Sequence, residues 1–148
     1  MCWTIDKELF KNNPENYHKV AEKDIIVYKF GKVKEGNFIP FYRNNYTYIS
    51  KCNNIRVELK LHYNVSINFI YFGYHSYLEK DYVINKIIDL QKAKFLYKIY
   101  PFIVGKFIIP KGTEYYINDD KEIVSSSIIW TGEGLSSKEN FKSIKYSL

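Results

Sequence analysis

The chain has 148 residues, of which 46% are hydrophobic and 18% aromatic, and its formal net charge is +6. That length suits a single domain, 1–148, with one buried core, and the apolar content excludes an intrinsically disordered chain. No apolar run is long enough for a membrane span, and the first residues do not resemble a signal peptide, so we expect a cytoplasmic protein with no membrane partner.

The N-terminal part predicts a short helix and a hairpin. The pattern Asn-Pro-Glu at 13–15 is typical of a helix start and predicts a helix to about Lys23. The β-branched and aromatic run 24–30 predicts a strand that ends at Gly31. The turn residues at 34–37 predict that the chain then returns as a second strand, which the next proline confines to an edge or ends.

The clearest periodicity in the sequence lies at 55–63. Apolar residues alternate there with charged residues and a histidine, which predicts a half-buried strand. The following run, 65–74, is apolar on both faces and predicts a more central strand. We expect the two strands to form a hairpin through 63–65.

One long helix is predicted after these strands. Ser76 and Glu79 have the spacing of a capping box, in which each side chain bonds the other residue's backbone amide. Apolar residues then recur at helical spacing, so the helix is expected over about 77–98, before Pro101.

The C-terminal part predicts further strands and then a polar tail. Apolar and β-branched runs at 102–109, 113–117 and 122–130 are separated by turn residues and predict three strands. Gly132 and Gly134 indicate a turn, and 132–148 is expected to be a loosely attached tail. The expected fold is α+β, with a curved, mixed but mainly antiparallel sheet and the long helix on one face.

Lysine dominates the basic excess, and arginine stands only at positions 43 and 56. The positive charge predicts attraction to an anionic small molecule, a nucleotide, nucleic acid or an acidic host protein. Because arginine provides the bidentate contacts that read DNA, its scarcity makes nucleic acid the less favoured partner. A solvated lysine surface from an AT-rich genome is the alternative explanation.

Metal and cofactor motifs are absent from the sequence. It contains two cysteines and three histidines: Cys2, Cys52, His18, His62 and His75. They share no ligand spacing, and no phosphate-loop or dinucleotide fingerprint occurs, so we expect neither a metal nor a cofactor. Removal of Met1 would make Cys2 an N-terminal nucleophile, although a small buried hydrophobic side chain is the other interpretation.

The step from the predicted strand to the predicted helix is the candidate site. His75 stands there between Tyr74 and Ser76, where exposed helix amides can hold an anion. In the competing interpretation, Ser76 caps the helix and His75 fills a polar gap. The full set of ligand-binding candidates is Lys29, Arg43, Arg56, Tyr74, His75, Ser76 and Lys111, with Tyr28, Tyr42 and Tyr74 as stacking surfaces.

Several short islands resemble small uncharacterised proteins of phages and prophages. They are the Met-Cys start, a segment within 21–29, the aromatic-His-Ser-aromatic step at 74–77, the Ile-Pro-Lys-Gly-Thr-x-Tyr-Tyr run at 109–116, and Val124 with Ser125. This resemblance implies a phage-type accessory protein, acting in the cytoplasm of the host cell.

A second resemblance is to ADP-ribosyltransferases, in which a Gly-aromatic-x-Ser step precedes a helix and a later Pro-x-Gly-Ser/Thr strand entry leads to a catalytic glutamate. It implies that 74–76 line a nicotinamide nucleotide and that Glu122 or Glu133 is the acid. Lys29 stands where such enzymes usually place Arg or His, and neither glutamate lies in a Glu-x-Glu pair.

Three classes of function follow from the sequence. The first is a binding protein that captures a phosphate-bearing ligand or blocks a host defence component. The second is a nucleotide-processing enzyme in which His75 acts with Glu122 or Glu133. The third is a structural or assembly protein whose tyrosines form an oligomer interface.

Overall fold

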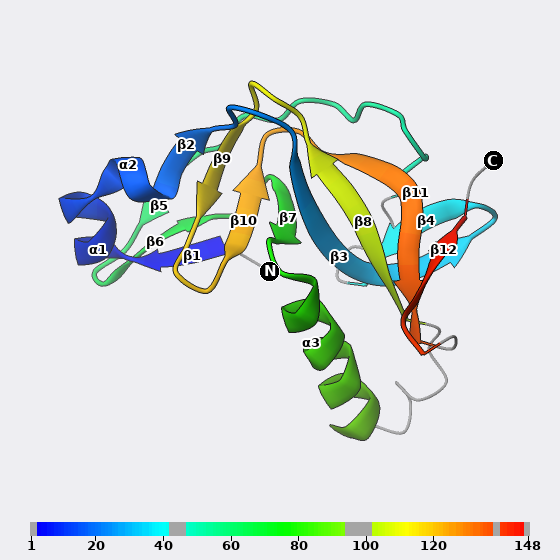
Figure 1. Ribbon diagram of the computed structural model, residues 1–148. Helices are drawn as coiled ribbons and strands as arrows, with labels where there is room; N and C mark the ends of the chain where they lie inside the picture. The colour runs from blue at the N-terminus through cyan, green and yellow to red at the C-terminus, as the bar shows by residue number, and fades with distance from the viewer. Residues whose placement is uncertain (1–2, 42–46, 94–101, 138–139, 147–148) are drawn as a thin grey trace.

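Two antiparallel sheets and three helices form the part of the chain that the computed structural model describes, residues 3–41, 47–93, 102–137 and 140–146 (Figure 1). The helices are α1 (Lys7–Asn12), α2 (Pro14–Tyr17) and α3 (Lys80–Ala93). The strands are β1 (Trp3–Asp6), β2 (His18–Val20), β3 (Ile25–Lys34), β4 (Asn37–Pro40), β5 (His62–Tyr63), β6 (Ile67–Ile70), β7 (Tyr74–Tyr77), β8 (Ile103–Ile109), β9 (Glu114–Ile117), β10 (Glu122–Ser125), β11 (Ile129–Ser136) and β12 (Lys142–Lys145).

The larger sheet is built around β3 and β8, which pair without interruption from Ile25 opposite Ile109 to Gly31 opposite Ile103. Its strand order is β12-β11-β8-β3-β7-β10-β9-β2, with β4 paired to β3 as a hairpin. Every pairing between the described strands is antiparallel. The α+β prediction, with a mainly antiparallel sheet, is confirmed.

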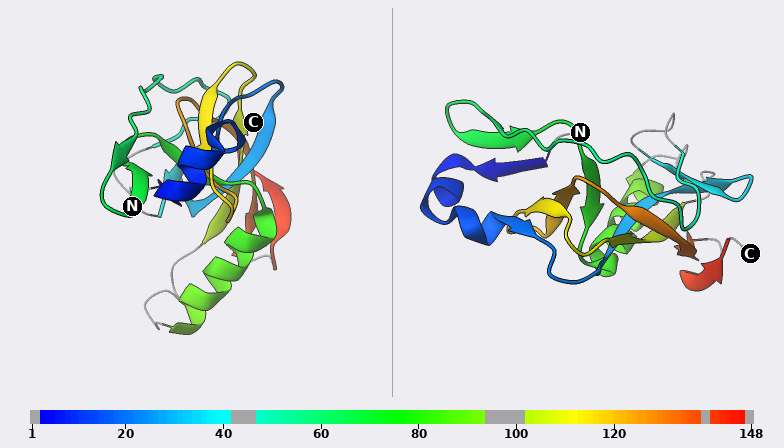
Figure 2. Two further views of the ribbon diagram at one scale, coloured as in Figure 1. Left: turned by 90° about the vertical axis from the view of Figure 1, so that its left-hand side faces the viewer. Right: turned by 90° about the horizontal axis from the view of Figure 1, so that it is seen from above.

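A second, three-stranded sheet has the order β1-β6-β5 and lies to one side of the larger sheet (Figures 1 and 2). Its inward side chains, among them Trp3 and Ile70, join Tyr116 of β9 and Val124 of β10 in one apolar cluster. The Trp3 indole N–H donates to the Glu122 carbonyl oxygen at 2.8 Å, which gives this buried polar atom a partner. Packing of this cluster holds the two sheets together.

The larger sheet buries apolar side chains on both faces. On one face Trp130, Phe107 and Phe38 form a fully buried aromatic group, with Phe107 edge-on to Phe38 at a centroid distance of 5.0 Å. On the other face α3 inserts Val83 and Ile87 against a third cluster that includes Phe30, Tyr77, Phe102 and Val104. The helix therefore packs against one face of the sheet, as the sequence predicts, and its far end extends beyond the strands (Figure 1).

The described part of the long helix begins at Lys80 instead of residue 77, and the predicted end of the helix lies outside the described residues. Ser76 belongs to β7, where it pairs with Ile123 of β10, so the capping-box prediction is wrong. Its hydroxyl is buried and has no hydrogen-bond partner among the described residues. Tertiary pairing of 74–77 with β10 has replaced the local alternative of a helix cap.

The N-terminal prediction is wrong in its extent. Asn13 precedes a helix with proline at its first position, but α2 ends at Tyr17 and His18–Val20 continues as β2, paired with β9. The sequence missed α1, which precedes it. The Asp6 carboxylate caps that helix by accepting hydrogen bonds from the backbone N–H groups of Glu8 and Leu9.

Gly31 does not end its strand. The chain continues as β3 to Lys34 before the predicted turn returns it along β4. A Cβ atom at position 31 would overlap the Ile39 carbonyl oxygen and lie 2.9 Å from the Cα of Pro40. Glycine is therefore required here by the close approach of the two hairpin strands, not by a chain break.

The alternating segment 55–63 forms a strand only at its last two residues, β5. Leu59 is buried while its neighbours Glu58 and Lys60 are exposed, so the predicted alternation of burial is present without a strand. The predicted hairpin does form, since β5 pairs with β6, but the run 65–74 divides into β6, a short connection and β7.

The C-terminal strands at 102–109 and 113–117 are found as β8 and β9, whereas the predicted strand 122–130 divides into β10 and the start of β11. The predicted turn and tail at 132–148 instead continue β11 to Ser136, and β12 follows within the described residues. Gly132 has a φ of +86°, and the register of β11 with β8 shifts between Trp130 and Gly134, so the glycines mark a β-bulge.

Replacing Ser76 by alanine separates the strand from the cap interpretation. A capping serine contributes about 1 kcal/mol, whereas removal of a buried hydroxyl without a partner relieves a desolvation cost. We expect Ser76→Ala to leave the free energy of unfolding unchanged or raise it by up to ~1 kcal/mol in urea titrations. Asp6→Ala, which removes a cap seen in the structure, should lower it by about 1 kcal/mol; a similar loss for Ser76→Ala would restore the cap interpretation.

Candidate functional site

The three consecutive candidates in β7 do not converge, because neighbouring residues of a strand point to opposite faces. Tyr74 and Ser76 face the cluster that contains Phe107 and Trp130, and the Tyr74 hydroxyl donates to the Ile55 carbonyl oxygen at 2.5 Å. His75 is on the opposite face, and its Nε2 atom lies 3.4 Å from the Tyr71 carbonyl oxygen. A single pocket lined by all three side chains is therefore not formed.

Lys29 reaches β7 from the neighbouring strand. Among the described residues β3 and β7 pair only at Tyr28 opposite Tyr77, and the strands separate beyond that point. The Lys29 ammonium donates to the His75 carbonyl oxygen and lies 5.7 Å from the centre of the Tyr48 ring. Lys29 therefore links β3 to β7 at the point where the backbone pairing of these two strands ends.

The two candidate acids lie far apart in the sheet. Glu122 stands on β10 directly opposite Tyr77, two residues along from the pairing of His75 with Val124, so Glu122 and His75 are diagonal neighbours on one face. Glu133 stands on β11, which β8, β3 and β7 separate from β10, and its carboxylate lies 3.9 Å from the Lys106 ammonium. Only Glu122 is placed to act with His75.

Helix α3 adds a cation and a ring to the surroundings of Glu122. The Lys86 ammonium lies 5.4 Å from the ring centre of Tyr77 and 5.3 Å from that of Tyr82. Burial raises the pKa of the Glu122 carboxyl above its ordinary value of 4.5; Lys86 opposes this shift and Asp120 adds to it. The half-buried carboxylate is therefore held in surroundings that favour its protonated form.

Four candidates remain, and the structure describes two of them, Lys111 and Arg56. Arg43 and Tyr42 lie outside the described residues. Lys111 is exposed in the turn after β8, where its backbone N–H donates to the Asp24 carboxylate at 2.9 Å. Arg56 is exposed on the segment that leads to β5.

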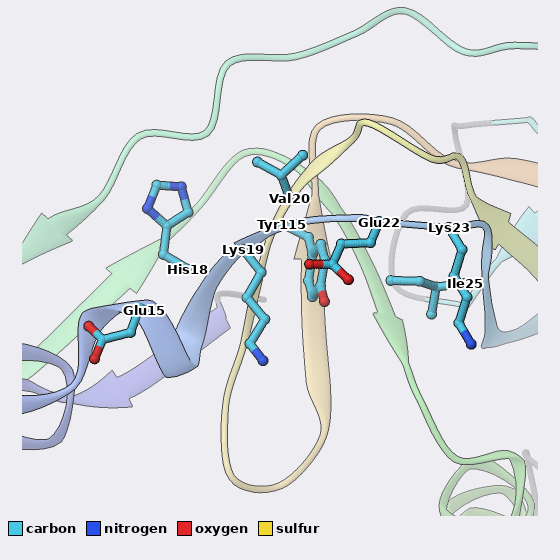
Figure 3. A pocket seen from close by; sticks show the side chains of 8 residues that line it. All are labelled: Glu15, His18, Lys19, Val20, Glu22, Lys23, Ile25 and Tyr115. Atoms are coloured by element: carbon cyan, nitrogen blue, oxygen red, sulfur yellow. The ribbon is translucent and has the colours of Figure 1, made fainter.

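An open hollow of about 470 Å³ lies beside β2, at the end of the larger sheet (Figure 3). Its lining residues are Glu15, His18, Lys19, Val20, Glu22, Lys23, Ile25 and Tyr115. Lys19, Lys23 and the Tyr115 ring point to one side of the ribbon, whereas the His18 ring points to the other (Figure 3). Two lysines and two glutamates balance in charge, so the hollow has no preference for an anion.

His18 is already engaged at this edge. Its ring stacks on Tyr116 at a centroid distance of 4.2 Å, and its Nε2 atom lies 2.8 Å from the Glu114 carboxylate. Burial and the neighbouring Glu22 raise the pKa of Tyr115 above 10.0, so its phenol stays protonated at neutral pH. These contacts account for His18 and Tyr115 as parts of the β2–β9 pairing.

Partly exposed rings gather instead on the outward side of the three-stranded sheet. His62 of β5 stands opposite Phe69 of β6, and their rings stack at a centroid distance of 5.5 Å. Tyr71 lies edge-on to Phe69 at 4.9 Å and 5.7 Å from His62. These three residues are called the outer aromatic face below.

Cationic side chains flank the outer aromatic face. Arg56 and Lys60 are exposed and alternate with the more buried Val57, Leu59 and Leu61, so the alternation directs them to the same outward side as His62. Two acids share this side: Glu58, which is exposed, and Asp6, whose carboxylate caps α1 and keeps its negative charge. The face therefore joins aromatic rings to two cations and two carboxylates, which balance in formal charge.

The sequence missed this face because strand register creates it. Alternation in 55–63 does place His62 outward, together with Arg56 and Lys60. Phe69 and Tyr71, in contrast, lie in a run with apolar residues on both faces, so nothing local shows which of its rings are exposed. Only the pairing of β5 with β6 brings them beside His62.

Replacing Glu122 by glutamine tests the burial of its carboxyl. The folded-state pKa is above the unfolded one, so the charged carboxylate destabilises the folded protein at neutral pH. That penalty disappears as the pH falls through the folded pKa. We expect the melting temperature of Glu122→Gln to exceed that of wild type at pH 7, with the difference shrinking toward pH 4; a difference that grows on acidification would contradict this assignment.

Metal and membrane sites find no support in the described residues. No group of three or more histidine, cysteine, aspartate or glutamate side chains is placed there to hold a metal ion. Cys52 is an exposed free thiol, while Cys2 lies outside the described ranges. None of the described helices is long and apolar enough to span a bilayer.

Comparisons with known proteins do not assign this chain to a family. No family model matches the sequence. A search of curated proteins and a search of solved structures likewise returned no match.

Proposed function

We propose that this chain is a phage-type accessory protein that captures a phosphate-bearing nucleotide in the host cytoplasm, and that the base stacks on the outer aromatic face. The observation that carries the proposal is the contact of three partly exposed rings, His62, Phe69 and Tyr71, on one side of a small sheet. Tyr71 is 48% exposed, so about half of this residue's surface faces solvent. Aromatic rings on a sheet hold bases by stacking, whatever the base.

The charge of the molecule supports an anionic ligand at this face. Arg56 and Lys60 flank the rings, and the whole chain carries a net charge of +6. A nucleotide would place its base on the rings and its phosphate toward these side chains. Inorganic phosphate lacks the stacking contribution and would bind more weakly.

Binding without turnover fits this face better than catalysis. His62 is the titratable ring of the outer aromatic face, and it has no hydrogen-bonded carboxylate among the described residues. A histidine acting as general base is normally oriented by such a partner. We therefore expect a nucleotide to be held and returned unchanged.

Tyr71→Ala is the direct test of the stacking site. Loss of one stacked ring costs ~1–3 kcal/mol, so the affinity for ADP should fall by a factor between about 5 and about 150. Thermal shift measures the binding: ADP and ATP should raise the melting temperature of the wild type more than inorganic phosphate at the same concentration. Chromatography of the recovered ligand then distinguishes capture from turnover.

Tyr82→Ala is the matched control, because Tyr82 is an exposed tyrosine on α3, away from the outer aromatic face. It should leave the affinity for ADP unchanged. Equal losses in the two variants, or no shift of the wild type by any nucleotide, would remove the basis of the proposal. A ligand returned hydrolysed or transferred would favour the enzyme alternative, with His75 and Glu122 as the residues to replace next.

A second candidate function, the blocking of a host defence protein, is favoured by the exposed apolar side chains near the same sheet. Among the described residues the four most exposed large hydrophobic side chains all fall within 55–72: Val65 at 96%, Ile55 at 82%, Tyr63 at 74% and Phe72 at 70%. Exposed apolar groups gathered in this way mark protein interaction surfaces.

Photo-crosslinking in producing cells tests that second candidate. A crosslinker at Phe72 should yield one discrete heterologous product, and a crosslinker at Val20, which is 59% exposed on β2, should not. A product of twice the chain mass would indicate self-assembly instead. The same products from both positions, or none from either, would remove the support for a specific protein partner.

A further inference from the structure

The segment 55–63 has the strongest strand pattern in the sequence but lacks a strand partner over most of its length. Its backbone is tied at Val57, whose N–H donates to the Ser126 carbonyl oxygen at 2.9 Å. From 58 to 61 the backbone N–H and C=O groups make no hydrogen bond to any described residue. Leu59 is buried and Leu61 is half-buried, while Glu58 and Lys60 are exposed, so this stretch keeps the alternation of a strand.

This stretch leads directly into an edge of the three-stranded sheet. The order β1-β6-β5 leaves one side of β5 without a neighbouring strand among the described residues. The other edge of that sheet, β1, is partly covered because the Asn118 side-chain amide donates to the Thr4 carbonyl oxygen at 3.0 Å. The trace over residues 47–61 runs along the outside of the molecule, and β5 continues it (Figures 1 and 2).

An open edge with strand-forming side chains is a template for a further strand, and this sequence is complementary to itself. We propose that two copies of the chain pair antiparallel through 55–63, with Leu59 of one copy opposite Leu59 of the other. In this pairing the Val57 N–H exchanges the Ser126 carbonyl oxygen of its own chain for the Leu61 carbonyl oxygen of the second copy. In that register Glu58 stands opposite Lys60, and by symmetry Lys60 stands opposite Glu58. Opposite charges in facing positions stabilise an antiparallel pair.

The same register also matches the apolar positions. Val57 stands opposite Leu61, and Ile55 stands opposite Tyr63. The last two are 82% and 74% exposed in the single chain, and the pairing gives each of them an apolar neighbour. A twofold arrangement of this kind is closed, so it forms a dimer and does not extend into a filament.

The two ends of the larger sheet are poorer candidates for self-pairing. Strand β12 carries exposed Lys142 and Lys145, and β2 is three residues long with Lys19 at its centre. Short length and lysine side chains protect sheet edges against association. Among these described edges, 55–63 alone combines unpaired backbone groups with charges of opposite sign in facing positions.

The dimer would also complete the outer aromatic face. The register places Arg56 of one copy opposite His62 of the other, so each set of rings gains an arginine from the second chain. This consequence rests on the proposed function, whereas the pairing itself does not. A failure of nucleotide binding would leave the dimer unaffected, and the two proposals are measured separately.

Charge reversal tests the register. Sedimentation equilibrium of the full chain, over concentrations that extend into the high micromolar range, should show a reversible dimer. Lys60→Glu places glutamate opposite Glu58 at both symmetric positions, and Glu58→Lys places lysine opposite Lys60. Each should weaken dimerisation about tenfold or more, since every facing pair changes from attractive to repulsive.

Two rescues make the test specific to the proposed pairs. The double variant Glu58→Lys with Lys60→Glu should dimerise like the wild type. An equimolar mixture of the two single variants should form a heterodimer, because every facing pair is again of opposite charge. Lys111→Glu, which makes the same charge change at an exposed position away from the edge, should leave dimerisation unchanged.

Far-UV circular dichroism and thermal unfolding confirm that each variant keeps its fold. A wild type that stays monomeric throughout the concentration series overturns the proposal. So does a dimer that the single variants leave intact, or a mixture of the two that fails to associate.

Discussion

The antiparallel pairing of β3 with β8 is the constraint on which the rest of the structure depends. It is unbroken over seven facing pairs, from Ile25 opposite Ile109 to Gly31 opposite Ile103. Because a strand pair presents alternate residues to its two faces, this one pair supplies Val27 and Phe107 to one core and Phe30 and Val104 to the other. Helix α3 and the hairpin strand β4 are both positioned against it.

A second consequence of strand pairing is the division of the predicted site. Had 74–76 formed the loop before a capped helix, their side chains could have pointed into a single hollow. Instead, the segment pairs with β10 and forms the strand β7. Because side chains alternate between the two faces along a strand, Tyr74 and Ser76 lie on one face and His75 on the other. The polar groups that remain near one another, such as His75 and Glu122, are those that share a face.

The three-stranded sheet shows the same principle at the surface. Its inward face is closed by Trp3, Ile70 and Tyr116, whereas its outward face exposes rings and its β5 edge exposes backbone. A nucleotide on the rings and a second chain on the edge would each satisfy groups that the single chain leaves open. Both proposals thus arise from one small element whose outward side the described part of the fold does not cover.

The sequence by itself determined the fold class, most of the strands, the existence of α3 and the alternation of burial in 55–63. Hydrophobic periodicity predicts these features because the tendency of each side chain to be buried depends on its own residue type. Only the tertiary structure decided that Ser76 belongs to a strand, that 55–61 has no paired strand among the described residues, and that Phe69 and Tyr71 lie beside His62. These outcomes depend on which backbone groups pair across long sequence separations. A local pattern indicates that a segment is suited to form a strand, but it does not indicate which strand it pairs with.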